Sequence, residues 1–229
     1  MSTTFYSDLF QPRQQGMRVL VACEYSGIVR NAFIARGHDA WSCDLLPSED
    51  GSNRHIRGDA REILNDGWDF LMVAHPPCTR LCNSGVRWLS RPPPGRTAED
   101  MQRELREGAD LFSAFWNAAI ERICVENPVM HKHAKALIVN YREFSQSVQP
   151  WQFGHGETKR TCFWLKNLPL LMPTEIVRGR EQRVFRMPPR PSALEREIAL
   201  LSRHRKSNGR TMGIAKSRYA FNPRSSVSD

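Results

Sequence analysis

The first predicted elements restrict this chain to a small group of folds. Residues 18–23 are mostly apolar and predict a strand, which a polar turn ends at Gly27. Residues 28–36 predict a helix, and residues 39–44 predict a second strand whose last residue is Asp44. A strand, a tight turn, a helix and a strand that ends in an acid open the nucleotide-binding type of α/β fold. We therefore predict an α/β domain whose sheet carries helices on both faces.

The turn after the first strand and the acid after the second are candidate cofactor contacts. Tyr25, Ser26 and Gly27 precede the first amides of the helix, where a ligand can meet them. Asp44 follows this turn by roughly 20 residues, a spacing at which a carboxylate can accept hydrogen bonds from a ribose. Asp59 precedes a short predicted helix and is either its N-cap or a further ligand contact.

A later apolar run ends in two prolines and a cysteine. Residues 70–74 predict a short buried strand, and His75, Pro76, Pro77 and Cys78 follow it. Proline cannot donate a hydrogen bond to a β ladder, so the strand stops there and Cys78 lies on a stiff turn at its carboxyl end. Ligands bind at that edge of an α/β sheet. This cysteine is a candidate nucleophile, with simple packing as the alternative.

The next predicted strand also ends in polar residues. An amphipathic helix begins at the capping pattern of Thr97 and leads into an apolar run that closes on Glu126 and Asn127. Because a helical crossover makes two strands parallel neighbours, Cys78 and Glu126 should meet at one edge of the sheet.

Composition limits the kinds of binding partner and the cellular compartment that we expect for this chain. The formal net charge of +9 over 229 residues favours a polyanionic partner, and much of the excess lies in residues 178–218. The six cysteines show no C-x-x-C spacing, which favours a reducing cytoplasm over a disulfide framework. A zinc site of His75, Cys78 and Cys82 would lack a second ligand pair, so we expect no metal. No apolar run approaches a length of about 18 residues, so we expect no membrane contact.

Together these motifs resemble the DNA (cytosine-5)-methyltransferase family. Tyr25-Ser26-Gly27 is similar to its Phe-x-Gly cofactor loop, and Gly58-Asp59 to the pair that meets the adenine. Pro77-Cys78 resembles the nucleophile motif, and Glu126-Asn127 the motif that binds the target base. Arg160, which opens Arg-Thr-Cys-Phe-Trp, resembles the arginine that touches the cytosine.

The resemblance implies a Rossmann-like fold and methyl transfer from S-adenosylmethionine to C5 of a cytosine flipped out of double-stranded DNA. The implied catalytic residues are Cys78, Glu126 and Arg160. The implied cofactor contacts are Tyr25, Ser26, Gly27, Asp44, Asp59 and Pro76, and the implied substrate contacts are Pro77, Thr79 and Asn127. The oligomeric state stays open.

The sequence and the resemblance together give a domain plan similar to that of compact phage and prophage proteins. A flexible N-terminus over residues 1–16 precedes a catalytic domain over residues 17–168. A reduced, basic target-recognition segment over residues 169–210 and a helix over residues 211–221 follow. Residues 222–229 form a disordered tail.

Other activities remain open at this point. His75-Pro76-Pro77-Cys78 also resembles the Asp/Asn-Pro-Pro-aromatic motif of N4 or N6 amino-methyltransferases, although no aromatic residue stands at position 78. Cytosine in RNA is a second possible substrate. A protein that binds nucleic acid without catalysis is the third alternative.

Overall fold

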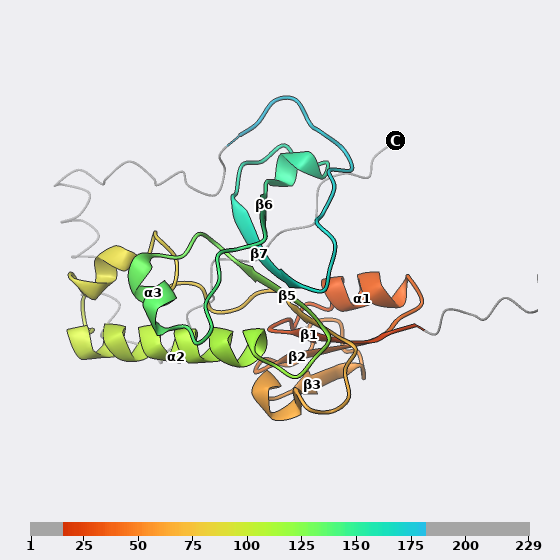
Figure 1. The fold of residues 1–229 in the computed structure, drawn as a ribbon, viewed down its shortest axis with the longest axis horizontal. Coiled ribbons are helices and arrows are strands. Elements are labelled where there is room, and N and C mark those ends of the chain that lie inside the picture. Colours follow the sequence, from red (N-terminus) through yellow and green to blue (C-terminus); the bar gives the residue numbers. More distant parts are fainter. Residues whose placement is uncertain (1–15, 182–229) are drawn as a thin grey trace, which may run out of the picture. The chain divides into compact units, whose positions relative to one another are not determined.

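The computed structural model describes residues 16–181, which fold around a mixed sheet of seven strands (Figure 1). Its order is β3-β2-β1-β4-β5-β7-β6. The strands are β1 (Arg18–Ala22), β2 (Asp39–Asp44), β3 (His55–Arg57), β4 (Phe70–Val73), β5 (Arg122–Asn127), β6 (Gln146–Val148) and β7 (Thr161–Lys166). Strands β1 to β5 are parallel, whereas β7 runs antiparallel to both β5 and β6. The predicted α/β class is confirmed.

Helices connect the strands and follow the predicted order closely. They are α1 (Ile28–Ile34), α2 (Ala98–Trp116) and α3 (Lys132–Leu137), with 3-10 turns η1 (Ala60–Ile63), η2 (Val86–Leu89) and η3 (Pro150–Gln152). The predicted start of the long helix is confirmed, because Thr97 and Asp100 form a reciprocal capping box. The sequence also predicts a strand over residues 147–153. That prediction is wrong beyond Val148, because Pro150 starts η3.

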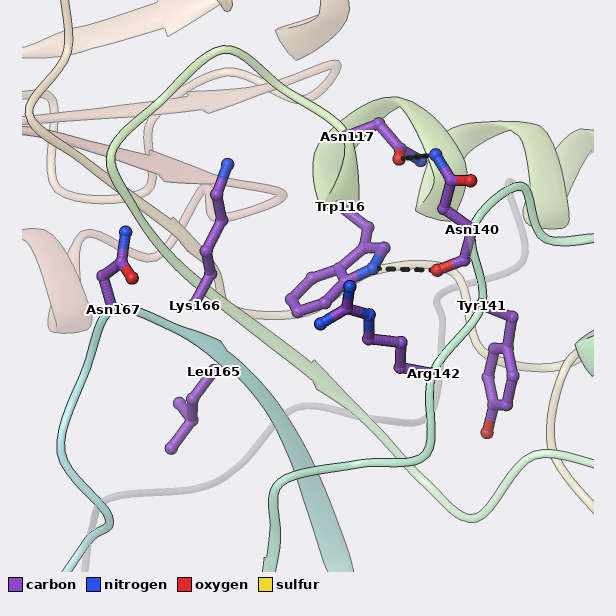
Figure 2. A pocket seen from close by; sticks show the side chains of 8 residues that line it. All are labelled: Trp116, Asn117, Asn140, Tyr141, Arg142, Leu165, Lys166 and Asn167. Atoms are coloured by element: carbon purple, nitrogen blue, oxygen red, sulfur yellow. Dashed lines mark hydrogen bonds between the residues drawn. The ribbon is translucent and has the colours of Figure 1, made fainter.

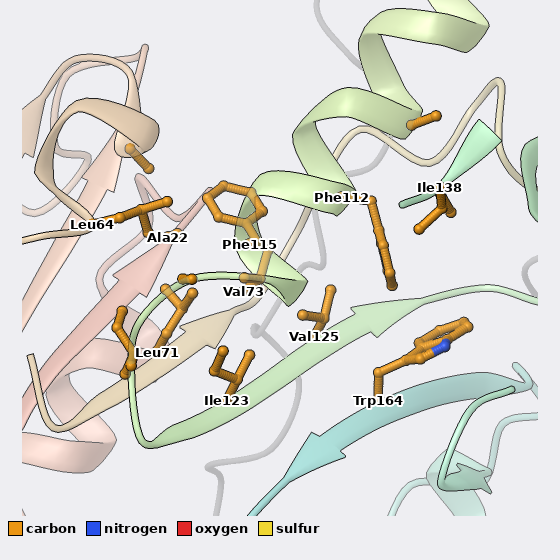
Figure 3. Close-up of a cluster of buried hydrophobic side chains, with 14 of the residues drawn as sticks. Ala22, Leu64, Leu71, Val73, Phe112, Phe115, Ile123, Val125, Ile138 and Trp164 are labelled. Carbon is orange, nitrogen blue, oxygen red and sulfur yellow. The ribbon is translucent and has the colours of Figure 1, made fainter. Parts of the chain in front are cut away.

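Alternate residues of the central strands face two separate apolar layers, as the two-residue period of a strand requires. Leu20 and Ala22 of β1 belong to the larger layer, which Phe112 and Phe115 of α2 cover (Figure 3). Val19 and Val21 face the other layer, against which Phe33 and Ile34 of α1 pack. Helices therefore lie on both faces of the sheet, as predicted.

The strands before Cys78 and Glu126 are parallel neighbours, as predicted. Val73 of β4 is in register with Ala22 of β1 on one side and with Val125 of β5 on the other. The chain therefore leaves β1, β4 and β5 at the same edge of the sheet, and the residues that follow these strands meet there.

Several predicted segments lie wholly or partly outside the described residues. These are the N-terminus before Gly16, most of the basic segment, the helix over residues 211–221 and the tail over residues 222–229. The described start of the basic segment runs beside η3 through the bridge of Phe153 with Glu175. Over residues 16–181, no helix is long and apolar enough to cross a membrane.

Candidate active site

A buried carboxylate occupies the first turn of α1. Glu24, two residues after β1, is fully buried and accepts hydrogen bonds from the backbone N–H groups of Val29 (2.5 Å) and Arg30 (3.2 Å). The hydroxyl of Ser26 also donates to it, at 3.3 Å. In dinucleotide-binding folds these helix-start amides receive a phosphate. Here a side chain already satisfies them, so this turn does not suit a ligand that places phosphate there.

The backbone around Glu24 is held in an unusual conformation. Cys23 has a φ of 57°, in the left-handed region that a residue with a side chain rarely adopts. Gly27 has a φ of 76°, and a Cβ added there would lie 2.3 Å from a guanidinium nitrogen of Arg30. Both residues fix the turn that presents Tyr25, which is 37% exposed. Strained backbone of this kind gathers at functional sites.

A fully buried arginine joins α1 to the chain that follows Asp44. The guanidinium of Arg30 pairs with Asp50 and donates to the hydroxyl of Ser42 at 2.9 Å. That hydroxyl is also 2.9 Å from Nδ1 of His55. These bonds hold the loop over residues 45–54 against the cofactor turn predicted from the sequence.

We expect Asp50→Ala to destabilise the fold by about 3 kcal/mol, because removal of one partner leaves the other charge buried and poorly compensated. The free energy of unfolding in urea measures the loss. The matched control is Glu143→Ala, which breaks the ion pair of Glu143 with Lys135 and should cost less than about 1 kcal/mol, because Glu143 is exposed. Equal losses in the two variants would contradict a special role for the Arg30 network.

The two acids predicted at the cofactor site lie near the end of β1. The carboxylate of Asp44 accepts a hydrogen bond from the N–H of Leu46 at 2.9 Å. Asp59 is the N-cap of η1 and pairs with Arg61, so capping accounts for its local contacts. Burial, followed by Asp44 and then by Cys43 and Asp59, raises the pKa of the Cys23 thiol to about 12. Cys23 is therefore a neutral thiol beside an acidic rim.

The turn that carries Cys78 is tightly fastened. The backbone carbonyl of Cys78 accepts hydrogen bonds from the N–H groups of Leu81 and Cys82, both at 3.0 Å, so a helical turn begins at Cys78. A Cβ at Gly85 would lie 1.8 Å from the carbonyl oxygen of Thr79, which explains the glycine. Nε2 of His131 lies 2.7 Å from the carbonyl oxygen of Arg80 and ties the turn to the chain after β5.

The prolines before Cys78 divide between the core and the surface. Pro76 is buried, whereas Pro77 and Thr79 are exposed and Cys78 itself is half-buried. Pro77 and Thr79, the two residues expected to contact substrate here, are therefore accessible from solvent.

Glu126 lies at the end of β5, beside the Cys78 turn. Burial raises the pKa of Glu126 to about 7, against the opposing effect of Lys159. Contact with the Cys82 thiol, then burial and then the charges of Cys82 and Glu126 raise the pKa of Cys78, and Lys159 again opposes them. The structure therefore brings together a thiol, a carboxyl whose pKa lies near neutral pH and a cation.

That cation is Lys159, which sequence reasoning missed in favour of its neighbour Arg160. Glu126 pairs with Phe163 of β7, and strand alternation continued back from Phe163 places Lys159 on the same face. Arg160 falls on the opposite face, where its guanidinium lies 5.6 Å from the ring centre of Phe144. Only the register of β7 against β5 could have separated these two residues.

Asn127, a further predicted substrate contact, lies in an unusual environment. It is fully buried at the end of β5, and its side-chain nitrogen and oxygen have no hydrogen-bond partner among residues 16–181. Buried amide groups are rarely left unpaired, because each lost hydrogen bond costs free energy.

A surface hollow lies at the opposite end of the strands from Cys78, near the start of β5 (Figure 2). It is lined by Trp116, Asn117, Asn140, Tyr141, Arg142, Leu165, Lys166 and Asn167. Its polar groups bond to one another, as in the contact of the Asn140 amide with Asn117 at 2.7 Å. They fasten the end of α2 to the chain after α3, far along the strands from Cys78.

The cluster around Cys78 lies at the ligand-binding position of open α/β sheets. Strand order reverses between β1 and β4, and such sheets bind ligands at the carboxyl ends of the strands at that point. Glu24 follows β1 and Cys78 follows β4, so both lie at this switch point. No protein-family model matches the chain, and no curated protein matches it.

Proposed function

We propose that this protein transfers a methyl group from S-adenosylmethionine to C5 of cytosine in DNA, with Cys78 as the nucleophile. The observation that carries the proposal is the meeting of half-buried Cys78 with Glu126, whose pKa is raised to about 7, at the switch point of the sheet. The sheet order β3-β2-β1-β4-β5 supports a Rossmann-like methyltransferase fold, to which β7 and β6 add a mixed edge.

The residues at the cofactor turn fit S-adenosylmethionine better than a dinucleotide. Glu24 already fills the anion position of α1, and this cofactor brings no phosphate to it. Its sulfonium is a cation, which the acidic rim of Glu24, Asp44 and Asp59 favours. Leu45 and Leu46 are 70% and 52% exposed beside Asp44, and they offer apolar surface for an adenine ring. The cofactor would supply the electrophilic methyl group.

The Cys78 cluster holds the thiol, the proton donor and the cation that cytosine chemistry uses, and the raised pKa of Cys78 means that its proton must leave before the sulfur attacks. C5 of cytosine is a weak nucleophile until a thiolate adds to C6 and makes C5 enamine-like. In this mechanism the Cys78 sulfur forms a bond to C6, and Glu126 in its protonated form donates to N3 as negative charge develops on the ring. After methyl transfer, a base removes the C5 proton and the bond from sulfur to C6 breaks. The base must be flipped out of the duplex to reach the thiol.

Lys159 is our choice for the group that binds the cytosine carbonyl oxygen. Its charge acts on both Cys78 and Glu126, so an ammonium donor stands beside the thiol and the acid. Arg160, which the resemblance favours for this role, would have to leave Phe144 to reach the same place. Pro77, Thr79 and Asn127 remain proposed substrate contacts at this edge.

We expect Asp44→Ala to weaken S-adenosylmethionine binding by about 1–3 kcal/mol, the usual loss for a charged hydrogen bond. Isothermal titration calorimetry measures the change. The matched control is Asp39→Ala at the opposite end of β2, where the carboxylate pairs with half-buried Arg54 and should not affect cofactor affinity. Asp44 also accepts the N–H of Leu46, so thermal unfolding must first show that the variant is folded. Unchanged affinity in a folded variant would remove Asp44 from the site.

The direct test of the proposed function is transfer of a labelled methyl group to mixed DNA and RNA, followed by nucleoside analysis. Label in 5-methylcytosine from DNA is the expected result. Label on N4 of cytosine or N6 of adenine would instead identify an amino-methyltransferase. Label found only in RNA would identify RNA as the substrate. Binding of nucleic acid without methyl transfer would favour the non-catalytic alternative.

A further inference from the structure

Cys78 and Cys82 form a thiol pair on one short turn, and each thiol changes the pKa of the other. The backbone bond from the Cys82 N–H to the Cys78 carbonyl, at 3.0 Å, gives the spacing of one helical turn. Such a turn places the two Cα atoms roughly 6 Å apart. Disulfides bridge Cα atoms separated by about 4.4–6.8 Å.

The turn holds this pair in a fixed frame. The N–H of Asn83 donates to the carbonyl of Val129, and the N–H of His131 donates to the carbonyl of Leu81, both at 3.0 Å. Gly85 closes the turn on its other side. The backbone therefore keeps the two cysteines one helical turn apart.

The two thiols differ in access and in acidity. Cys78 is half-buried, whereas Cys82 is 6% exposed, with its sulfur 3.0 Å from the hydroxyl of Ser84. The Cys78 thiol and then the Ser84 hydroxyl lower the pKa of Cys82, against the opposing effect of burial. The same contact raises the pKa of Cys78. Cys78 can therefore react with a disulfide oxidant, and Cys82 is placed to displace the half of the oxidant that stays bound to Cys78.

Other cysteines of the described chain lack this combination. Burial raises the pKa of Cys23, Cys43, Cys124 and Cys162. None of these four has a thiol of lowered pKa one helical turn away along the chain, as Cys78 has in Cys82.

We propose that Cys78 and Cys82 are a reversible oxidation site, which a disulfide oxidant such as oxidised glutathione converts into an intrachain disulfide. The inference rests on the proposed function only for its consequence. A Cys78 sulfur held in a disulfide cannot add to C6 of cytosine, so oxidation switches the enzyme off.

The chemistry balances in two exchange steps. Cys78 loses its proton, attacks one sulfur of oxidised glutathione and releases one glutathione thiolate. The Cys82 thiolate then attacks the Cys78 sulfur, forms the intrachain bond and releases the second glutathione thiolate. Two protein thiols are oxidised, and one glutathione disulfide is reduced to two thiols.

Peptide mapping of the full-length folded protein tests the site without any need for activity. The protein is incubated with oxidised glutathione, acid-quenched, alkylated while denatured and digested with trypsin. Because Arg80 lies between the two cysteines, the disulfide should join two tryptic peptides, and dithiothreitol should separate them. A wild-type Cys78 that keeps glutathione, or a pair that stays fully alkylated, would overturn the proposal.

Two variants distinguish the roles of the two sulfurs. Cys82→Ser should stop at one glutathione on Cys78, because no buried thiol remains to displace it. Cys78→Ser should leave Cys82 unmodified, because Cys82 is buried. Rapid glutathionylation of Cys82 in folded Cys78→Ser, with folding checked by circular dichroism, would reverse the assigned roles.

The outcomes for this site and for the proposed function are separable. A cross-linked peptide together with no methyl transfer by the reduced protein would reject the proposed function alone. Methyl transfer by the reduced protein without any cross-link would reject the oxidation site alone. If both inferences hold, oxidised glutathione should abolish transfer and dithiothreitol should restore it.

Discussion

Glu126→Gln should lower the rate of methyl transfer by about 10²–10⁴-fold, the usual contribution of a general acid. Glutamine keeps the size and can donate an amide hydrogen bond to N3, but it cannot deliver a proton. Burial raises the pKa of Glu126 to about 7, so the wild-type side chain loses its proton as the pH rises through that value. The wild-type rate should therefore carry a falling limb near pH 7 that the glutamine variant lacks. Single-turnover rates from pH 6 to 9 on one DNA measure both effects.

The same substitution should change the pH dependence of stability. The pKa of Glu126 is raised from 4.5 to about 7 in the folded protein, so the native state binds more protons than the unfolded state between these values. Wild-type stability should fall across that window, whereas Glu126→Gln should not share the loss. The variant should thus become more stable than the wild type by on the order of 3 kcal/mol above pH 7, and the difference should vanish below about pH 4.5.

Urea unfolding at pH 4.5 and pH 8 measures this difference. Glu121→Gln is the matched control, because Glu121 is exposed and stands just before β5. Its effect should be within about 0.5 kcal/mol at both pH values. A constant difference between Glu126→Gln and the wild type across this pH range would contradict the raised pKa of Glu126.

The early part of the fold could be predicted because its signals are local. Apolar runs and a glycine turn define β1, α1 and β2, and a capping box starts α2. The parallel pairing of β4 with β5 followed from the crossover helix alone. Strand β3 was missed because its three residues, His55–Arg57, form too short a run to show a periodic pattern.

The candidate site was predictable in part, since Glu126 stands at the end of β5 and Cys78 lies on the turn that follows β4. Glu24 looked like an ordinary turn residue, and its role as the buried cap of α1 depends on the fold of Gly27 around it. Arg30 gave no signal, because an arginine in an amphipathic helix is usually exposed, and here Asp50 lets it be buried. The choice between Lys159 and Arg160 depends on strand register, which sequence reasoning did not reach.

The covalent step at Cys78 is the central claim, and a DNA duplex with 5-fluorocytosine at the target position tests it most directly. Fluorine at C5 cannot leave as a cation, so the bond between sulfur and C6 cannot be released after methyl transfer. With S-adenosylmethionine present, the wild-type protein should form a complex with DNA that survives denaturing electrophoresis. Cys82→Ala, the matched control four residues along the turn, should form it too, whereas Cys78→Ala should form none. Methylation of DNA cytosine by Cys78→Ala at a rate near that of the wild type would contradict the mechanism.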